Sequence, residues 1–112
     1  MSDFAGAGRH VPPGASSHEA GGVTVKYFAT IRTYTGETVR HLDGAPAGLH
    51  ELLTALAGRY GTSFRRAVFA GDELNHEIII LVNGRNVLYL QGLDTPLTVG
   101  DEVSIFPMVA GG

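Results

Sequence analysis

The chain has 112 residues, of which 44% are hydrophobic and 17% charged, a composition that predicts one globular domain. Its formal net charge of −3 disfavours a general nucleic-acid-binding protein, and the absence of cysteine excludes a disulfide scaffold, a cysteine-ligated metal site and a cysteine nucleophile. No apolar run is long enough to span a membrane and the N-terminus lacks a secretory-signal pattern, so we expect a cytoplasmic protein without a membrane partner.

Residues 1–22 differ in composition from the rest of the chain. Gly, Ala, Ser, Pro and His dominate this stretch, and Phe4 and Val11 are its sizeable apolar side chains. Such a composition buries too little apolar surface to offset the entropy of ordering the backbone. We therefore expect a disordered N-terminal extension over residues 1–22 and one folded domain over residues 23–112.

The folded domain begins with two segments that alternate apolar and polar side chains, the pattern of a half-buried strand. These segments are residues 23–28 and residues 37–42. Thr35-Gly36 lies between them and favours a turn. The sequence therefore predicts an antiparallel hairpin over residues 23–42.

The next segment has the spacing of one apolar helix face, carried by Leu49, Leu52, Leu53, Leu56, Ala57 and Tyr60. Gly61 suits the end of this helix, because glycine readily adopts the conformations that stop one. Phe64, Ala67 and Val68 indicate a short second helix.

Three more strands are expected in the last third of the chain. Residues 78–82 form a β-branched run, Asn83-Gly84 is a strong hairpin signal, and residues 87–90 supply a return strand. Residues 102–106 alternate into a final strand. The prediction is an α+β fold, with a mixed sheet of about five strands packed on one main helix plus a short second helix.

The sequence ends in two glycines, Gly111 and Gly112, which four residues separate from the final predicted strand. Given the glycine content, such an ending arises by chance with a probability of roughly 2%. A flexible end without function is the alternative interpretation. Glycine lacks a Cβ and tolerates most backbone conformations, so a Gly-Gly end can enter a channel too narrow for a side chain.

Several motifs occur in the order found in one known family: Val25-Lys26-Tyr27-Phe28-Ala29, Val82-Asn83-Gly84, Pro96-Leu97, Gly100-Asp101-Glu102-Val103 and the closing stretch from Ile105 to Gly112. With them, residues 23–112 resemble the ubiquitin-like β-grasp sulfur carriers, the family of the molybdopterin synthase small subunit and the thiamine sulfur carrier. Members of that family usually begin near the first strand, so the resemblance says nothing about residues 1–22.

The resemblance implies that this chain is not an enzyme but a carrier acting with partner enzymes. A ubiquitin-activating-like adenylyltransferase would use ATP to activate the carboxylate of Gly112, and a sulfur donor enzyme would convert it to a thiocarboxylate. Gly111 would thread the tail into a sulfur-accepting enzyme such as the molybdopterin synthase large subunit. The carrier itself would hold no stable cofactor, and no phosphate-binding loop stands in the sequence.

Strand parity indicates a partner interface. Val25 and Tyr27 share one face of the first predicted strand, which leaves Phe28 on the polar face, and Phe106 lies on the polar face of the last strand. Large aromatic side chains in such places are good interface anchors, although a twisted strand end could instead tuck each ring into the core. The expected partner interface comprises two aromatic rings and the segment before the glycines, namely Phe28, Phe106, Pro107, Met108, Val109 and Ala110.

The sequence gives little support for other kinds of functional site. The five histidines form no HxH or HxxxH pair, so no metal site is expected. Three functional alternatives remain open beside the molybdopterin pathway: a sulfur carrier for cysteine, methionine, thiamine or another metabolite; a ubiquitin-like modifier joined to target lysines; and a non-catalytic β-grasp binding module with a chance Gly-Gly ending.

Overall fold

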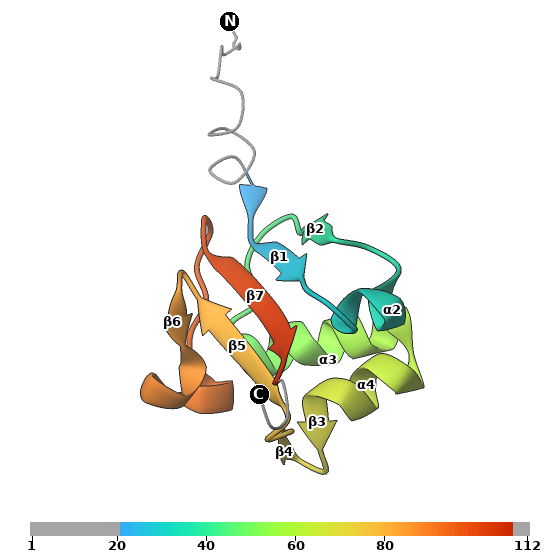
Figure 1. Cartoon of the computed structure of the whole chain (residues 1–112). Helices are drawn as coiled ribbons and strands as arrows, with labels where there is room; N and C mark the ends of the chain where they lie inside the picture. The colour runs from blue at the N-terminus through green and yellow to red at the C-terminus, as the bar shows by residue number, and fades with distance from the viewer. Residues whose placement is uncertain (1–20, 109–112) are drawn as a thin grey trace, which may run out of the picture.

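The computed structural model describes residues 21–108, and its centre is a five-stranded mixed sheet (Figure 1). The strands follow the spatial order β2-β1-β7-β5-β6. Their bounds are β1 Thr24–Tyr27, β2 Val39–His41, β5 Ile78–Val82, β6 Arg85–Asn86 and β7 Glu102–Pro107. A separate two-stranded ribbon is formed by β3 (Phe69–Ala70) and β4 (Glu73–Leu74).

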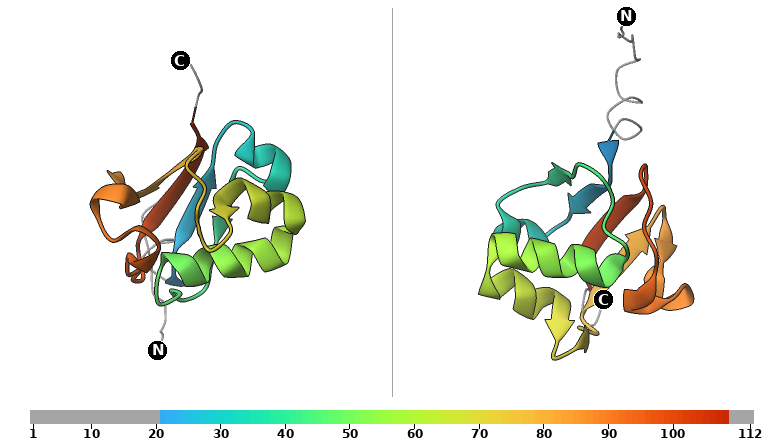
Figure 2. Two further views of the ribbon diagram at one scale, coloured as in Figure 1. Left: turned by 90° about the horizontal axis from the view of Figure 1, so that it is seen from below. Right: turned by 180° about the vertical axis from the view of Figure 1, so that it is seen from behind.

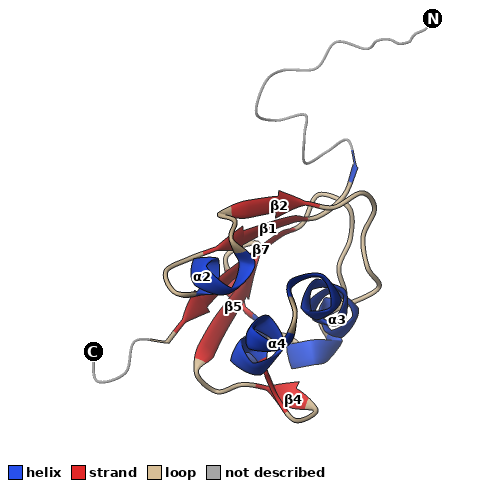
Figure 3. Cartoon of the chain, turned by 90° about the vertical axis from the view of Figure 1, so that its right-hand side faces the viewer, coloured by secondary structure: helices blue, strands red, loops and turns tan. Residues whose placement is uncertain are grey.

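In the described part of the chain, the helices α2 (Ile31–Thr35), α3 (Leu49–Tyr60) and α4 (Thr62–Val68) lie on one side of the sheet, as the end-on view in Figure 3 shows. The view from behind in Figure 2 shows α3 lying across the sheet. Two short 3₁₀ turns, η1 (Val87–Tyr89) and η2 (Gly92–Asp94), lie at the β6 edge. The sheet therefore has an inner face against the helices and an outer face without a helix among the described residues.

The two central strands, β1 and β7, are parallel. Their register pairs Thr24 with Glu102 and Tyr27 with Ile105. Strands β2 and β5 flank them and run antiparallel to their neighbours. Because β1 and β7 run in the same direction, β1 begins at one end of the sheet and β7 finishes at the other, so Thr24 and Pro107 lie at opposite ends.

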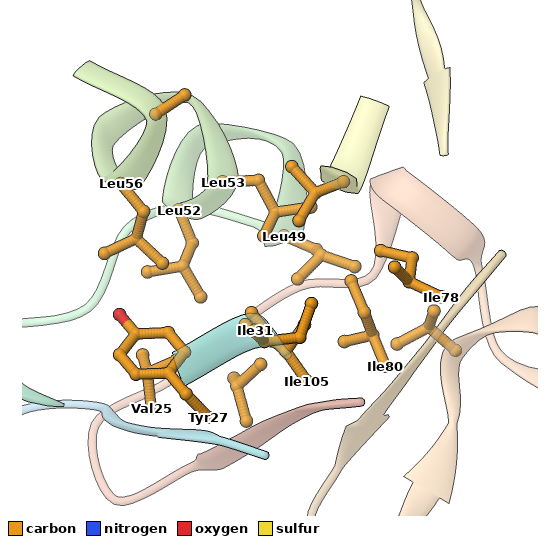
Figure 4. Close-up of a cluster of buried hydrophobic side chains, with 14 of the residues drawn as sticks. Val25, Tyr27, Ile31, Leu49, Leu52, Leu53, Leu56, Ile78, Ile80 and Ile105 are labelled. Carbon is orange, nitrogen blue, oxygen red and sulfur yellow. The ribbon is translucent and has the colours of Figure 1, made fainter. Parts of the chain in front are cut away.

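The core fills the space between the inner face and the helices (Figure 4). The predicted apolar face of α3 is buried there, and from the sheet come residues that alternate along β1, β5 and β7. The largest fully buried side chains include Tyr27, Phe64, Ile31, Leu49, Leu52, Leu53, Leu56, Ile80 and Ile105. The expected parity of the first and last strands is thus confirmed.

The predicted hairpin over residues 23–42 is confirmed as an antiparallel pairing of β1 with β2, but its connection is wrong. The helix α2 lies within it and ends at Gly36, whose φ of 72° is the left-handed conformation that favours glycine. The helix is five residues long and contains Ile31, Thr33 and Thr35, so its intrinsic helix propensity is low. Burial of Ile31, which is 1% exposed, stabilises it instead.

The helical prediction for the middle of the chain is confirmed. Helix α3 ends at Tyr60, and Gly61, with a φ of 100°, serves both as its C-cap and as the N-cap of α4. Phe64 and Val68 on α4 are buried, as the predicted second helix requires. The abrupt change of direction at Gly61 is why the two helices are separate.

The Asn83-Gly84 hairpin is also confirmed, but the predicted return strand over residues 87–90 is wrong. Strand β6 stops at Asn86, whose side chain accepts a hydrogen bond of 2.9 Å from the Leu88 N–H. This cap starts η1, and Val87, which is 1% exposed, anchors the turn in the core. The apolar residues of 87–90 therefore do not alternate across a sheet.

Candidate functional site

The candidate site lies where β7 leaves the sheet. Pro107 is still in register with Ile78 of β5, and the Met108 N–H donates a hydrogen bond of 2.8 Å to the Glu77 carbonyl. The central strand is thus held by the sheet up to Met108. The predicted residues Val109, Ala110, Gly111 and Gly112 lie outside the described residues.

The structure brings Phe28 and Phe106 together. The Phe28 N–H donates to the Ile105 carbonyl at 3.1 Å, so Phe28 continues the pairing of β1 with β7 beyond the end of the strand. The two rings stack, with centroids 4.3 Å apart and 11° between the ring planes. Both side chains are half-buried, because each ring covers part of the other. The two predicted interface aromatics therefore form one stacked pair.

Helix α2 adds a cation to this aromatic pair. The guanidinium of Arg32 lies 5.7 Å from the centroid of the Phe28 ring, and its Nε donates a hydrogen bond of 2.9 Å to the Tyr27 carbonyl. That bond fixes the side chain against the end of β1. The sequence reasoning missed Arg32 because it placed no helix between the first two strands.

The rest of the outer face combines apolar and charged side chains. Ile79, the register partner of Phe106, is half-buried and extends the apolar surface across β5. Lys26 and Glu102, on the neighbouring strands β1 and β7, form an ion pair of 3.1 Å whose side chains are 43% and 37% exposed. We call the surface made by Lys26, Phe28, Ile79, Glu102 and Phe106 the docking face. A partly apolar patch with charges at its border is the composition of a protein interface.

A groove of about 540 Å³ lies on the other side of the end of β7. Its walls come from α2, α4, the approach to β5 and the end of β7, and they include Tyr34, Arg66, Glu77, Pro107 and Met108. Tyr34 is 39% exposed and Met108 49% exposed. Pro107 and Met108, which were predicted as interface residues, therefore line a hollow beside the point where the tail begins.

Within residues 21–108 no helix is long and apolar enough to cross a membrane. In the same range, no group of three or more histidine and acidic side chains is placed to hold a metal ion. The site consists of a strand end, an aromatic pair and a groove.

The order of elements and the sheet topology define the ubiquitin-like β-grasp class, in which the central strand leads to the C-terminal end. The family model of the ThiS family matches residues 25–112 of this chain. The chain belongs to the ThiS family.

Curated relatives agree with that assignment. The chain is 41% identical over 71 residues to a putative sulfur carrier protein of Archaeoglobus fulgidus, covering 63% of this chain and 81% of the relative. It is 37% identical over 91 residues to small archaeal modifier protein 3 of Haloferax volcanii, covering 79% and 96%. It is 32% identical over 94 residues to the molybdopterin synthase sulfur carrier subunit of Pyrenophora tritici-repentis, covering 83% and 92%.

Solved structures have the same fold. The solution structure of small archaeal modifier protein 1 from Methanosarcina acetivorans matches with a TM-score of 0.69 at 34% identity, covering 80% of this chain and 95% of that one. The crystal structure of the Amycolatopsis orientalis BexX/CysO complex matches with a TM-score of 0.69 at 30% identity, covering 80% and 99%. The chain is therefore a ThiS-family protein whose curated relatives and structural neighbours are small sulfur-carrier and modifier proteins.

Proposed function

We propose that Gly112 carries sulfur as a C-terminal thiocarboxylate, after a partner enzyme has activated its carboxylate with ATP. The observation that carries the proposal is the course of β7. This central strand is held in the sheet up to Met108, beside the Phe28–Phe106 pair, and four residues follow Met108, the last of which is Gly112. Four residues extend at most about 14 Å, long enough to reach into a partner while the folded domain stays on its surface.

The chemistry explains why activation is needed. A carboxylate is a poor electrophile, and its mixed anhydride with the phosphate of AMP has a good leaving group. A sulfur nucleophile supplied by a donor enzyme then attacks the carbonyl carbon, and AMP departs. The carrier needs no cysteine for this, because the sulfur ends on its own terminal carbon, and the chain contains none.

The docking face supplies the affinity that holds the tail in the partner's site. Ordering a tail of four residues costs roughly 1–2 kcal/mol for each residue, and interface contacts must offset that cost. The stacked rings of Phe28 and Phe106 suit this role, since buried aromatic side chains dominate interface energies. Val109 and Ala110 would then follow the partner's channel, with Gly111 at its narrowest part, while Pro107 and Met108, held in the sheet, would contact the partner at the entrance of that channel.

Molybdopterin synthesis is our first choice of pathway, with the molybdopterin synthase large subunit as the sulfur-accepting enzyme. The Phe106-Pro107 ending and the 32% identity to a molybdopterin synthase sulfur carrier subunit support it. A carrier for cysteine, methionine or thiamine synthesis is the first alternative. The chain also resembles a protein in the crystal structure of the BexX/CysO complex. Sulfur-accepting enzymes other than molybdopterin synthase should therefore be tested as well.

A modifier function is the second candidate, because the chain is 37% identical to small archaeal modifier protein 3. The activation step is shared, and the two functions differ in the nucleophile that attacks the activated Gly112. Adducts that survive denaturation in cells and vanish when Gly112 is deleted would support this second function.

The test is the intact mass of the chain after incubation with ATP, a ubiquitin-activating-like adenylating enzyme and a sulfur donor enzyme from the same organism. The expected result is a gain equal to replacing one oxygen by sulfur, mapped to Gly112. A chain lacking Gly111 and Gly112 should keep its fold and show no gain. If the full chain gains no mass while a known carrier does so with the same enzymes, the proposal fails.

A further inference from the structure

The chain has a single lysine. Of its eight basic residues other than histidine, only Lys26 is a lysine and the rest are arginines. This matters for a protein whose C-terminus becomes an acylating agent, because an amine attacks an acyl-adenylate whereas the guanidinium of arginine stays protonated and does not. Apart from the N-terminal amine, Lys26 is the chain's one aliphatic amine.

The fold places that lysine on the docking face. Lys26 lies on the central strand β1, in register with Ser104 of β7 and Val39 of β2, and two residues before Phe28. Its side chain is 43% exposed, and the Nζ lies 3.1 Å from the Glu102 carboxylate. The ammonium is therefore accessible from the outer face and, among residues 21–108, is held there by one ion pair.

We propose that Lys26 is the internal site at which one copy of this chain is acylated by the activated Gly112 of another copy. The inference rests on the proposed activation of Gly112. The Lys26 amine attacks the Gly112 carbonyl carbon of the adenylate, a C–N bond forms, and the C–O bond to phosphate breaks. AMP leaves, and the former ammonium group gives up two protons to solvent.

The product inactivates the copy that is modified. Its Lys26 becomes a neutral amide, so the ion pair with Glu102 is lost. A second folded domain is also tethered two residues from Phe28, over the surface by which the modified copy would meet its partners. The tail of that copy then remains free but is no longer presented to an adenylating enzyme. Acylation of Lys26 thereby links the activation of one copy of the chain to the inactivation of another copy.

The test uses the full chain, ATP and the adenylating enzyme of the same organism, without a sulfur donor. We expect a covalent dimer on a denaturing gel. Tryptic digestion should yield the branched peptide that joins residues 86–112 to residues 10–32, because an acylated Lys26 is not cleaved.

Lys26→Arg keeps the positive charge beside Glu102 and should abolish this dimer. Glu102→Gln frees the amine and should raise its yield at least twofold, whereas the control Glu73→Gln, on β4, should leave it unchanged.

The consequence is tested on the purified Lys26-linked dimer in which the donor copy carries Lys26→Arg. Its free Gly112 should support less than a tenth of the ATP–pyrophosphate exchange of the monomer. Normal exchange would overturn the withdrawal of the modified copy, and a dimer joined only through the N-terminal amine would overturn the acceptor site. Thiocarboxylate formation with a sulfur donor is measured in parallel. If it proceeds while no Lys26 adduct forms, this inference fails alone; if neither product forms, the proposed activation of Gly112 fails too.

Discussion

The hydroxyl groups of Tyr27 and Tyr60 lie 2.9 Å apart and join the central strand β1 to the last residue of α3. The Tyr60 hydroxyl donates its proton to Glu37 Oε1 at 3.1 Å, so the Tyr27 hydroxyl is the donor in the shared bond. Burial raises the pKa of Tyr27 far above its ordinary value, with a further contribution from the bond to Tyr60. Tyr27 is thus a buried, neutral donor with one acceptor.

We expect Tyr60→Phe to be more destabilising than Tyr27→Phe. The first leaves the buried Tyr27 hydroxyl without its acceptor, at a cost of about 1–3 kcal/mol, whereas the second removes one bond and costs about 1 kcal/mol. Urea unfolding measures both free energies. The control Tyr34→Phe, at a 39% exposed position, should change little. Equal losses for the first two variants would contradict this donor assignment.

Glu37 should make stability depend on pH. Its carboxylate accepts hydrogen bonds of 2.8 and 2.6 Å from Arg40, which hold its pKa below the ordinary value of 4.5, and the Tyr60 hydroxyl lowers it further against the opposing effect of burial. A carboxyl with a lowered pKa in the folded state contributes stability above its unfolded pKa and loses it as the pH falls through the folded one.

Unfolding free energy should therefore fall as the pH drops below about 4.5, the range in which the unfolded carboxyl takes up its proton first. Glu37→Gln should reduce this slope without affecting stability trends above neutral pH. The measurement is urea unfolding at a series of pH values. If the unfolding free energy depends on pH equally in both proteins, other carboxyl groups cause the loss of stability at low pH.

The Phe28–Phe106 pair should matter for docking more than for folding. Replacing both by alanine should weaken binding to the adenylating enzyme at least tenfold, because the interface loses its aromatic anchors. Both rings are only half-buried, so we expect a modest fall in the melting temperature. Val99→Ala is the control, since Val99 is 54% exposed and precedes β7 at the opposite end of that strand. Equal effects of the two changes on binding, measured by calorimetry, would argue against the docking face.

Asn83 should be needed for the hairpin that precedes β6. It has a φ of 52°, its Nδ2 donates to Asp101 at 2.9 Å, and its Oδ1 accepts the Glu102 N–H at 2.9 Å. Asn83→Ala should cost about 2–3 kcal/mol, from the lost bonds and the left-handed backbone. Asn83→Gly loses the bonds but tolerates the backbone, so the difference between the two variants measures the strain. No difference would mean that the backbone relaxes.

Gly111→Val should preserve folding and block thiocarboxylate formation. The substitution adds a branched side chain where the tail is proposed to pass through a narrow channel. Thermal unfolding checks the first expectation, and intact mass after the activation reaction checks the second. Normal activation of this variant would contradict the threading of the tail.

Elements with strong periodicity were predictable from the sequence. The leucines of α3 and the alternation in β1 and β7 report burial directly, and both were confirmed. Helix α2 and the turn η1 were not predictable, because their stability comes from distant contacts. Ile31 is buried between elements that are far apart in the chain. Val87 is buried where η1 begins, although the local sequence predicts that strand β6 continues there.

The candidate site was predictable in part for the same reason. Strand parity placed Phe28 and Phe106 on the outer face, but only the parallel register of β1 with β7 stacks the two rings. Arg32 could have been found by noting that a cation four residues after Phe28 would lie near that ring if the intervening chain were helical. The groove beside Met108 requires four separate segments and has no local signal.

The parallel pairing of β1 and β7 also determines how this protein responds to force. A pull that starts at Thr24 and at Pro107 slides the two central strands along one another, so that every hydrogen bond between them bears load at once. An antiparallel pair held at one end would instead open one bond at a time. We therefore expect high resistance to extension between the two ends of the domain in single-molecule force measurements. A protein tethered through this C-terminal tail would then be held by a mechanically strong link.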